Sequence, residues 1–162
     1  MTQEHAMQKI TPCLWFDDQA EDAARFYVSL FRNSTIRDVS RYGEGAPRPA
    51  GTAMMVSFVL DGLEVQALNG GPEFSFTEAI SLSVAAQTQD EIDHLWEQLT
   101  DGGEPGQCGW LKDRYGLSWQ IVPPVLGELL GGPDPERSRR VMQAMLAMSK
   151  IDIAGLRAAY AQ

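Results

Sequence analysis

Gly62-Leu63-Glu64-Val65-Gln66-Ala67-Leu68 has a counterpart later in the chain, and this pair of stretches decides the fold. The counterpart is Gly116-Leu117-Ser118-Trp119-Gln120-Ile121-Val122, which aligns with it without an insertion or a deletion. Both stretches have the length and composition of a strand that begins after a tight turn. The strands and helices predicted before each stretch also come in the same order. We therefore interpret the pair as an internal duplication, which predicts an α+β fold.

The first copy, about residues 8–71, is predicted to form a β-α-β-β-β module. Its helix is expected from Gln19 onward, because small and apolar residues recur there at helical spacing, and Asp18 is placed to cap it. Asp61-Gly62 supplies the positive φ angles of a tight turn between the last two strands. The predicted strands are Ile10–Phe16, Ile36–Tyr42, Ala53–Leu60 and Leu63–Leu68.

The second copy, about residues 79–125, repeats this order around a helix at Asp90–Leu99. A further helical segment is expected over about residues 134–160, where Asp134 and the proline after it are typical of a helix start. The apolar stripe of that segment is typical of a core or of a dimer contact, and we expect a homodimer. The predicted strands of this copy are Ile80–Ala86, Gly109–Lys112 and Leu117–Val122.

The composition is that of an ordinary globular protein, and 162 residues are enough for one domain spanning 1–162 with its own core. A formal net charge of −9 would repel a phosphate backbone, so nucleic acid is not an expected partner. The longest apolar runs have strand length, and Met1 to Lys9 holds no apolar segment as long as that of a signal peptide. We therefore expect no membrane span and a cytoplasmic location. Cys13 and Cys108 are expected to be free thiols.

Five stretches carry a family resemblance. They are ITPCLWFDDQAEDAARFY (10–27), ALNGGP (67–72), DEIDHLWEQL (90–99), LKDRYGLSWQIVP (111–123) and MLAMSKIDIAGL (145–156). Together they resemble the PhnB-like branch of the vicinal oxygen chelate superfamily, which includes glyoxalase I, extradiol dioxygenases and the bleomycin and fosfomycin resistance proteins. The resemblance implies curled mixed sheets around a central cleft. Such clefts form within one chain or across a homodimer in the superfamily, and the sequence leaves both arrangements open.

The same branch carries the name 3-demethylubiquinone-9 3-methyltransferase domain, and the sequence allows a chemical test of that name. A site for S-adenosylmethionine usually needs a glycine-rich turn between a strand and a helix, with an acidic residue at the end of the next strand. The glycine pairs here instead follow a helix, as at Gly102-Gly103, or precede a proline, as at Gly70-Gly71. Methyl transfer is therefore not expected.

In the superfamily, every second residue of each strand lines the cleft. The bulky residues Leu117, Trp119 and Ile121 are expected to pack on the helix, which leaves Gln120 for the cleft. By the duplication, Gln66 and Leu68 face the same way. On the strand at 80–86, Ser81 and Ser83 face the cleft if Ile80, Leu82 and Val84 are core. On the first strand, Thr11, Cys13 and Trp15 face it if Pro12, Leu14 and Phe16 are core. The candidate ligand-binding residues are then Thr11, Cys13, Trp15, Gln66, Leu68, Ser81, Ser83, Trp110 and Gln120.

Metal-dependent members of the superfamily bind Mn, Fe, Ni or Zn through His or Glu. The resemblance maps those ligand positions onto Thr11, Gln66, Ser81 and Gln120. Neutral amides bind a divalent ion weakly, and protonated hydroxyls would leave its charge uncompensated. The two histidines, His5 and His94, are expected to lie in solvent. We therefore predict no metal site and no cofactor.

The remaining groups suit hydrogen bonding and stacking, so we predict a metal-independent protein that binds a small, neutral or polar-aromatic molecule. No base or positive charge is near Cys13 in the sequence, so its thiol is expected to be inert. Two alternatives stay open. One is an isomerase, lyase or transferase that acts on a small carbonyl or phosphonate compound, and the other is a dimeric interaction module without a ligand.

Overall fold

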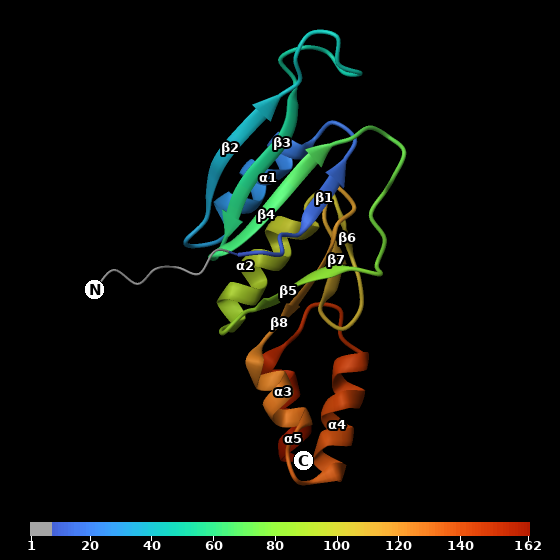
Figure 1. The fold of residues 1–162 in the computed structure, drawn as a ribbon. Helices are drawn as coiled ribbons and strands as arrows, with labels where there is room; N and C mark the ends of the chain where they lie inside the picture. Colours follow the sequence, from blue (N-terminus) through green and yellow to red (C-terminus); the bar gives the residue numbers. More distant parts are fainter. Residues whose placement is uncertain (1–7) are drawn as a thin grey trace, which may run out of the picture. The chain divides into compact units, whose positions relative to one another are not determined.

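Two four-stranded mixed sheets carry the fold within the described part of the chain, one in each half (Figure 1). The structure is a computed structural model that describes residues 8–162. It divides into two compact units, Met1–Ser75 and Phe76–Gln162, and each unit contains one sheet. The α+β fold of two modules is confirmed. The central cleft and the single domain that encloses both modules stay predictions.

The first sheet has the strand order β1-β4-β3-β2. β1 runs parallel to β4, and the other neighbours are antiparallel. Between β3 and β4, Asp61 has φ 45° and Gly62 has φ 83°, so the predicted tight turn is confirmed. The elements of this unit are β1 (Cys13–Phe16), α1 (Ala20–Leu30), β2 (Thr35–Arg41), β3 (Ala53–Leu60) and β4 (Leu63–Asn69).

α1 covers one face of this sheet and closes the core of the first unit (Figure 1). Small residues on its buried side allow the helix to approach the strands closely, and Tyr27 packs beside Phe58 with ring centroids 6.5 Å apart. Leu14 and Phe16 of β1 are buried under the helix, which confirms the predicted core face for these two residues, whereas Pro12 lies before β1 and is half-buried.

The start of α1 differs from the prediction. The N-cap position is Gln19, not Asp18, and its side chain makes no capping hydrogen bond. Instead, Ala20 N donates to Asn69 Oδ1 at 2.8 Å, and Asn69 Nδ2 donates to Ala53 O at 3.0 Å. A residue at the end of β4 therefore caps the helix from a distance, which a local sequence pattern does not reveal.

The second sheet has the order β5-β8-β7-β6, with β5 parallel to β8. Thr88 caps its helix by accepting from Glu91 N, and the Glu91 side chain accepts from Gln87 N, the residue before the cap. The two-residue strand β6 was not predicted. The elements are β5 (Ser81–Ala85), α2 (Gln89–Thr100), β6 (Glu104–Pro105), β7 (Trp110–Lys112) and β8 (Ser118–Val122).

The predicted core face of β8 is confirmed, because Leu117, Trp119 and Ile121 are all buried. The indole Nε1 of Trp119 donates to Asp113 Oδ2 at 2.9 Å, which satisfies two buried polar groups at once. The expectation for Ile80 is wrong. This residue lies before β5 begins and is 62% exposed, so it does not extend the core face.

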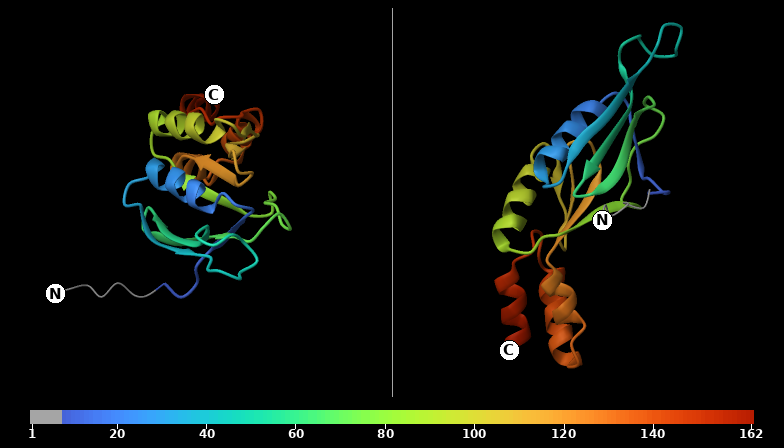
Figure 2. Two further views of the ribbon diagram at one scale, coloured as in Figure 1. Left: turned by 90° about the horizontal axis from the view of Figure 1, so that it is seen from above. Right: turned by 60° about the vertical axis from the view of Figure 1, so that its left-hand side comes forward.

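Three helices follow β8: α3 (Pro124–Leu130), α4 (Pro135–Leu146) and α5 (Ile153–Ala161). They lie beyond the strands of the second sheet and pack on one another, as Figure 2 shows. Asp134 caps α4 as predicted, accepting from the backbone of Glu136 and Arg137. α3 was not predicted. No helix within residues 8–162 is long and apolar enough to cross a bilayer.

Candidate functional site

The register of the first sheet brings the candidate residues of the first module to one face. Cys13 is the direct partner of Gln66, and Trp15 of Leu68. Directly paired residues point to the same side of a sheet, and the buried neighbours Leu14 and Phe16 point to the helix side. Cys13, Trp15, Gln66 and Leu68 therefore share the face that is turned away from α1.

A polar pocket of about 170 Å³ lies on this unit, and Thr11 and Gln66 both line it. Ser57, Arg37 and Glu64 also contribute, and Arg37 Nε lies 3.8 Å from Glu64 Oε1. Arg37 was not predicted here. It falls at a break in the β2–β3 register, between Ile36 and Asp38, and such a bulge changes the side to which a residue points.

Trp15 is held in place by the ALNGGP stretch. Its Nε1 donates to Gly71 O at 2.9 Å, and its ring meets Phe74 edge-on with centroids 4.9 Å apart. A side chain at Gly70 would overlap the indole ring, so glycine is required there by this close approach. The stretch therefore fixes an aromatic surface on the candidate face.

Cys13 has the properties of an unreactive thiol. Partial burial raises the pKa of its thiol above the ordinary value of 9.0. At neutral pH the thiol is therefore protonated, and the thiolate is the form that attacks electrophiles. That the Cys13 thiol is inert stays a prediction.

The register of the second sheet groups the other candidates. Ser83 and Trp110 are both direct partners of Gln120, on its two sides. Ser81 lies two residues before Ser83 on β5, hence on the same face, and Gln120 Nε2 donates to Ser81 Oγ at 3.0 Å. Ser81, Ser83, Trp110 and Gln120 therefore share the face opposite the buried Trp119.

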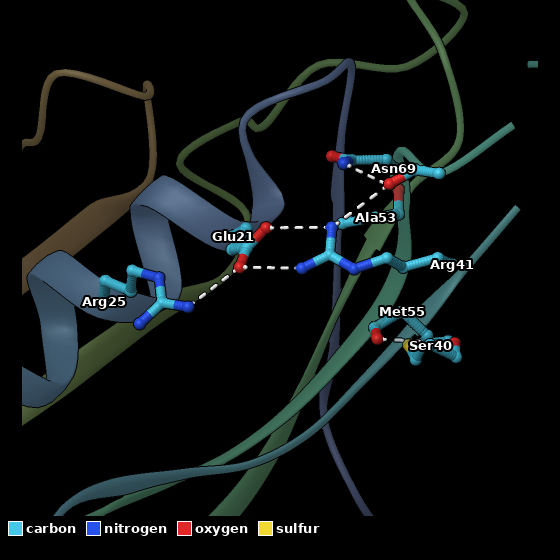
Figure 3. A network of polar contacts seen from close by, with 8 residues as sticks. Glu21, Arg25, Ser40, Arg41, Ala53, Met55 and Asn69 are labelled. Carbon is cyan, nitrogen blue, oxygen red and sulfur yellow. Dashed lines mark hydrogen bonds and ion pairs between the residues drawn. The ribbon is translucent and has the colours of Figure 1, made fainter. Parts of the chain in front are cut away.

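A larger pocket, of about 530 Å³, lies at the N-terminal end of α1 and was not predicted. Glu21 and Arg41 both line it. Arg25 approaches one carboxylate oxygen of Glu21 at 2.9 Å, and Arg41 approaches both at 3.4 Å (Figure 3). The hydrogen bond from Arg25 is the main reason that the pKa of Glu21 lies below 4.5. The spacing of Glu21 and Arg25 is visible in the sequence, but the arrival of Arg41 from β2 is not.

The residues at the mapped metal positions do not fit a metal of the kind that the superfamily binds. In this structure Gln120 donates to Ser81, so these two neutral groups satisfy each other. Across residues 8–162 no three His, Cys, Asp or Glu side chains gather as a metal ion would require. His94 is exposed, and His5 lies outside the described residues. Neutral amides and hydroxyls are poor ligands for divalent transition metals.

The residues also do not fit S-adenosylmethionine in the arrangement expected for it. The turn from β1 to α1 is Asp17-Asp18-Gln19, and the turn from β5 to α2 is Ala86-Gln87-Thr88. Neither contains a glycine, so a side chain stands at every position where the backbone would have to approach a bound cofactor.

Comparison with known families gives a match to 3-demethylubiquinone-9 3-methyltransferase over residues 8–122. The chain belongs to this family. A solved PhnB protein from Bacillus cereus is 38% identical to this family member, with a TM-score of 0.68. The similarity covers 72% of this chain and 99% of the Bacillus protein. A comparison with curated proteins finds no match.

More distant structures share the fold of this family member. A protein from Pseudomonas aeruginosa is 20% identical with a TM-score of 0.60, over 72% of this chain and 98% of that protein. The fosfomycin resistance protein FosX from Listeria monocytogenes, solved with Mn(II) and sulfate, is 15% identical with a TM-score of 0.50. That match covers 78% of this chain and 98% of FosX. This chain thus shares its fold with the PhnB protein and, at lower similarity, with FosX.

Proposed function

We propose that this protein binds a small polar or aromatic molecule without a metal ion, on the sheet faces that carry Gln66 and Gln120. One observation supports this most strongly. The duplicated strand gives each module a glutamine on the face away from its helix, and each glutamine has a hydroxyl beside it. Thr11 lines the same pocket as Gln66, and Ser81 accepts from Gln120.

The chemistry of these faces is that of recognition by hydrogen bonds and stacking. An amide offers both a donor and an acceptor, and a hydroxyl can do either, so each pair can adapt to a neutral polar group. Trp15, fixed by Gly71 and Phe74, adds a rigid aromatic surface.

Thermal-shift titration with a panel of small aromatic and polar compounds tests this proposal. We expect at least one compound to raise the melting temperature in a concentration-dependent way, and Gln66→Ala or Gln120→Ala to weaken that effect about tenfold or more. Gln143→Ala on the exposed side of α4 serves as the matched control. Stabilisation that survives both glutamine substitutions would sink the proposal.

Calorimetric titration with Mn²⁺, Ni²⁺, Zn²⁺ and Fe²⁺ tests the second half of the proposal. We expect no stoichiometric, tight binding of any of them. Tight binding that Gln66→Ala or Gln120→Ala abolished would overturn metal independence, and so would metal-dependent turnover of a small carbonyl or phosphonate compound.

We also propose a homodimer in the cytoplasm. Met142 and Leu146 of α4 are 40% and 58% exposed, and exposed apolar residues on one helix favour an interface. Two free cysteines are in keeping with a reducing compartment. Sedimentation should give a dimer that Leu146→Glu dissociates and Glu97→Gln, at an exposed position of α2, does not. A monomer at micromolar concentration contradicts the assembly, and cell fractionation tests the location.

A further inference from the structure

A second pocket, of about 220 Å³, lies within the second unit on the face that carries Gln120. The register shows which side chains share it. Ser118 is the direct partner of Lys112, and Lys112 of Glu104, so these three form one row across β8, β7 and β6. Trp110 stands two residues before Lys112 on the same face. Glu78, from the segment before β5, completes the lining.

Ser118 is an unusual member of this pocket. It is 1% exposed, and its Oγ is a buried oxygen with no hydrogen-bond partner among residues 8–162. Buried hydroxyls normally have a partner, because an unpaired one loses its bonds to water without replacement. By contrast, Ser81, the direct partner of Ser118 between β5 and β8, has a hydrogen bond, because its Oγ accepts from Gln120. Ser118 lines the pocket, and rotation about its Cα–Cβ bond moves Oγ between staggered positions, so a ligand that reaches this hydroxyl needs a rotamer that turns Oγ toward the pocket.

The charges of the pocket favour a cation. Lys112 Nζ already forms an ion pair with Glu78. Glu104, opposite Lys112 in the β6–β7 ladder, adds a second carboxylate, so two negative charges face one positive charge. An anion would have to displace Glu78 from Lys112 and also approach Glu104. A cation is repelled by Lys112, but it is attracted by two carboxylates, so the net charge of these three groups favours it. The face of Trp110 also attracts positive charge.

We propose that this pocket binds the protonated amine of the small ligand. Ser118 Oγ accepts one N–H, the Glu104 carboxylate accepts another, and the ring of Trp110 lies beside the charge and its attached carbon skeleton. The inference rests on the proposed function, which it deepens by naming the chemical class of the ligand and the residues that select it.

Three compounds of one shape test the assignment: benzylamine, benzyl alcohol and benzoate. We expect benzylamine to bind at least tenfold more tightly than the other two in calorimetry. In ¹H–¹⁵N spectra it should shift the Ser118 amide and the Trp110 indole signals. Glu104→Gln and Ser118→Ala should each weaken benzylamine at least tenfold. Glu97→Gln, an exposed carboxylate on α2, should leave the affinity unchanged.

Ser118→Ala also separates a ligand-binding role from a structural one. Because the hydroxyl has no partner in the described chain, its removal should leave the melting temperature of the free protein unchanged or higher while affinity falls. A lower melting temperature in the free protein with unchanged benzylamine affinity overturns the assignment.

The remaining outcomes distinguish this inference from the proposed function. Binding of benzoate in preference to benzylamine overturns the amine assignment and leaves small-molecule binding in place. Binding of other compounds through Gln66 and Gln120, with no shift at Ser118 or Trp110, overturns the pocket alone. If no small molecule binds at all, both the inference and the proposed function fail.

Discussion

Asn69 joins three parts of the first unit at the end of β4. Its side chain accepts from Ala20 N and donates to Ala53 O, and its carbonyl accepts from the Tyr42 hydroxyl at 2.6 Å. The residue is buried, so none of these bonds is easily replaced by water. The asparagine of the ALNGGP stretch therefore has a structural role, and the glycine after it admits Trp15.

Asn69→Ala should lower the free energy of unfolding by about 2–3 kcal/mol, because it removes a helix cap and leaves a buried N–H and a buried carbonyl unpaired. Urea denaturation of the variant measures this loss. Asp18→Ala is the matched control, since Asp18 is exposed and the N-cap position is Gln19; we expect a change within about 0.5 kcal/mol. A larger effect at Asp18 than at Asn69 would contradict the assignment of the cap.

For single residues, the sequence predicted the strand face on which a side chain lies better than it predicted the side chains that it contacts. Leu117, Trp119 and Ile121 alternate with smaller residues, and a period of two fixes the face of a strand directly. The strand register pairs Cys13 with Gln66 and Trp15 with Leu68 on one face of the first sheet, and the role of that face in binding a ligand stays a prediction. Reasoning from a period of two could not find Arg37 beside Glu64, because the bulge that turns Arg37 is not encoded in a simple period.

Among the helices and strands, the starts of α1, α2 and α4 show when neighbouring residues are enough to predict a helix cap. α4 begins at a local cap, Asp134, whose side chain accepts from two backbone N–H groups. α2 begins at Thr88, whose side chain accepts from Glu91 N, while the Glu91 side chain accepts from Gln87 N. These two starts follow from neighbouring residues, whereas the start of α1 depends on Asn69, 49 residues away.

Asp134→Ala should reduce stability by about 1 kcal/mol through the loss of the α4 cap. Asp152→Ala offers a control at the N-cap position of α5, where the side chain makes no capping hydrogen bond, and should have an effect below about 0.5 kcal/mol. Thermal unfolding followed by circular dichroism compares the two. Equal losses would show that the cap geometry of α4 contributes nothing specific.

Two elements, α3 and β6, were not predicted, and both contain a proline, which occurs at the ends of strands as well as in the first turn of helices. The prolines that follow the predicted strand Leu117–Val122 are typical of a strand end, but proline also suits the first turn of a helix, and α3 begins at Pro124. β6 is only Glu104–Pro105, and a proline in so short a strand leaves no recognisable pattern.

Across the whole molecule, several carboxylates are paired with basic side chains in ways that depend on pH. The pKa values of Glu21, Glu78, Asp93 and Glu136 all lie below their ordinary values, mainly because Arg25, Lys112, Lys150 and Arg139 respectively donate hydrogen bonds to them. A carboxyl group with a lower pKa in the folded state holds fewer protons there than in the unfolded chain. Folding is therefore favoured while these groups are ionised.

The free energy of unfolding should accordingly be retained at pH values above the ordinary pKa values of 4.5 for Glu and 3.8 for Asp, and lost as pH falls through the lowered values. Urea denaturation between pH 7 and pH 3 at low salt measures this. Glu21→Gln should remove about 0.3–1 kcal/mol of the stability at pH 7 and flatten the acid slope. Glu44→Gln, in the exposed β2–β3 loop, is the control. Stability that rose on acidification would contradict this.

For the whole chain, the family name and the chemistry of the side chains indicate different functions. The chain belongs to a family named for methyl transfer, yet neither strand-to-helix turn contains a glycine that would admit the backbone to a cofactor. The residues on its sheet faces are amides, hydroxyls and aromatic rings. A fold carries many chemistries, so the function proposed here follows from those side chains rather than from the family name.

The bond between Asn69 and Ala20 also bears on the order in which the first unit folds. Forty-nine residues separate the two partners, so the loop between them must close before the first turn of α1 gains its cap. The hairpin of β3 and β4 needs only the turn at Asp61-Gly62 and can form early. The strands on which the helix packs thus also supply the group that completes it. The N-terminus of the nascent α1 should therefore fray until β4 has paired with β1.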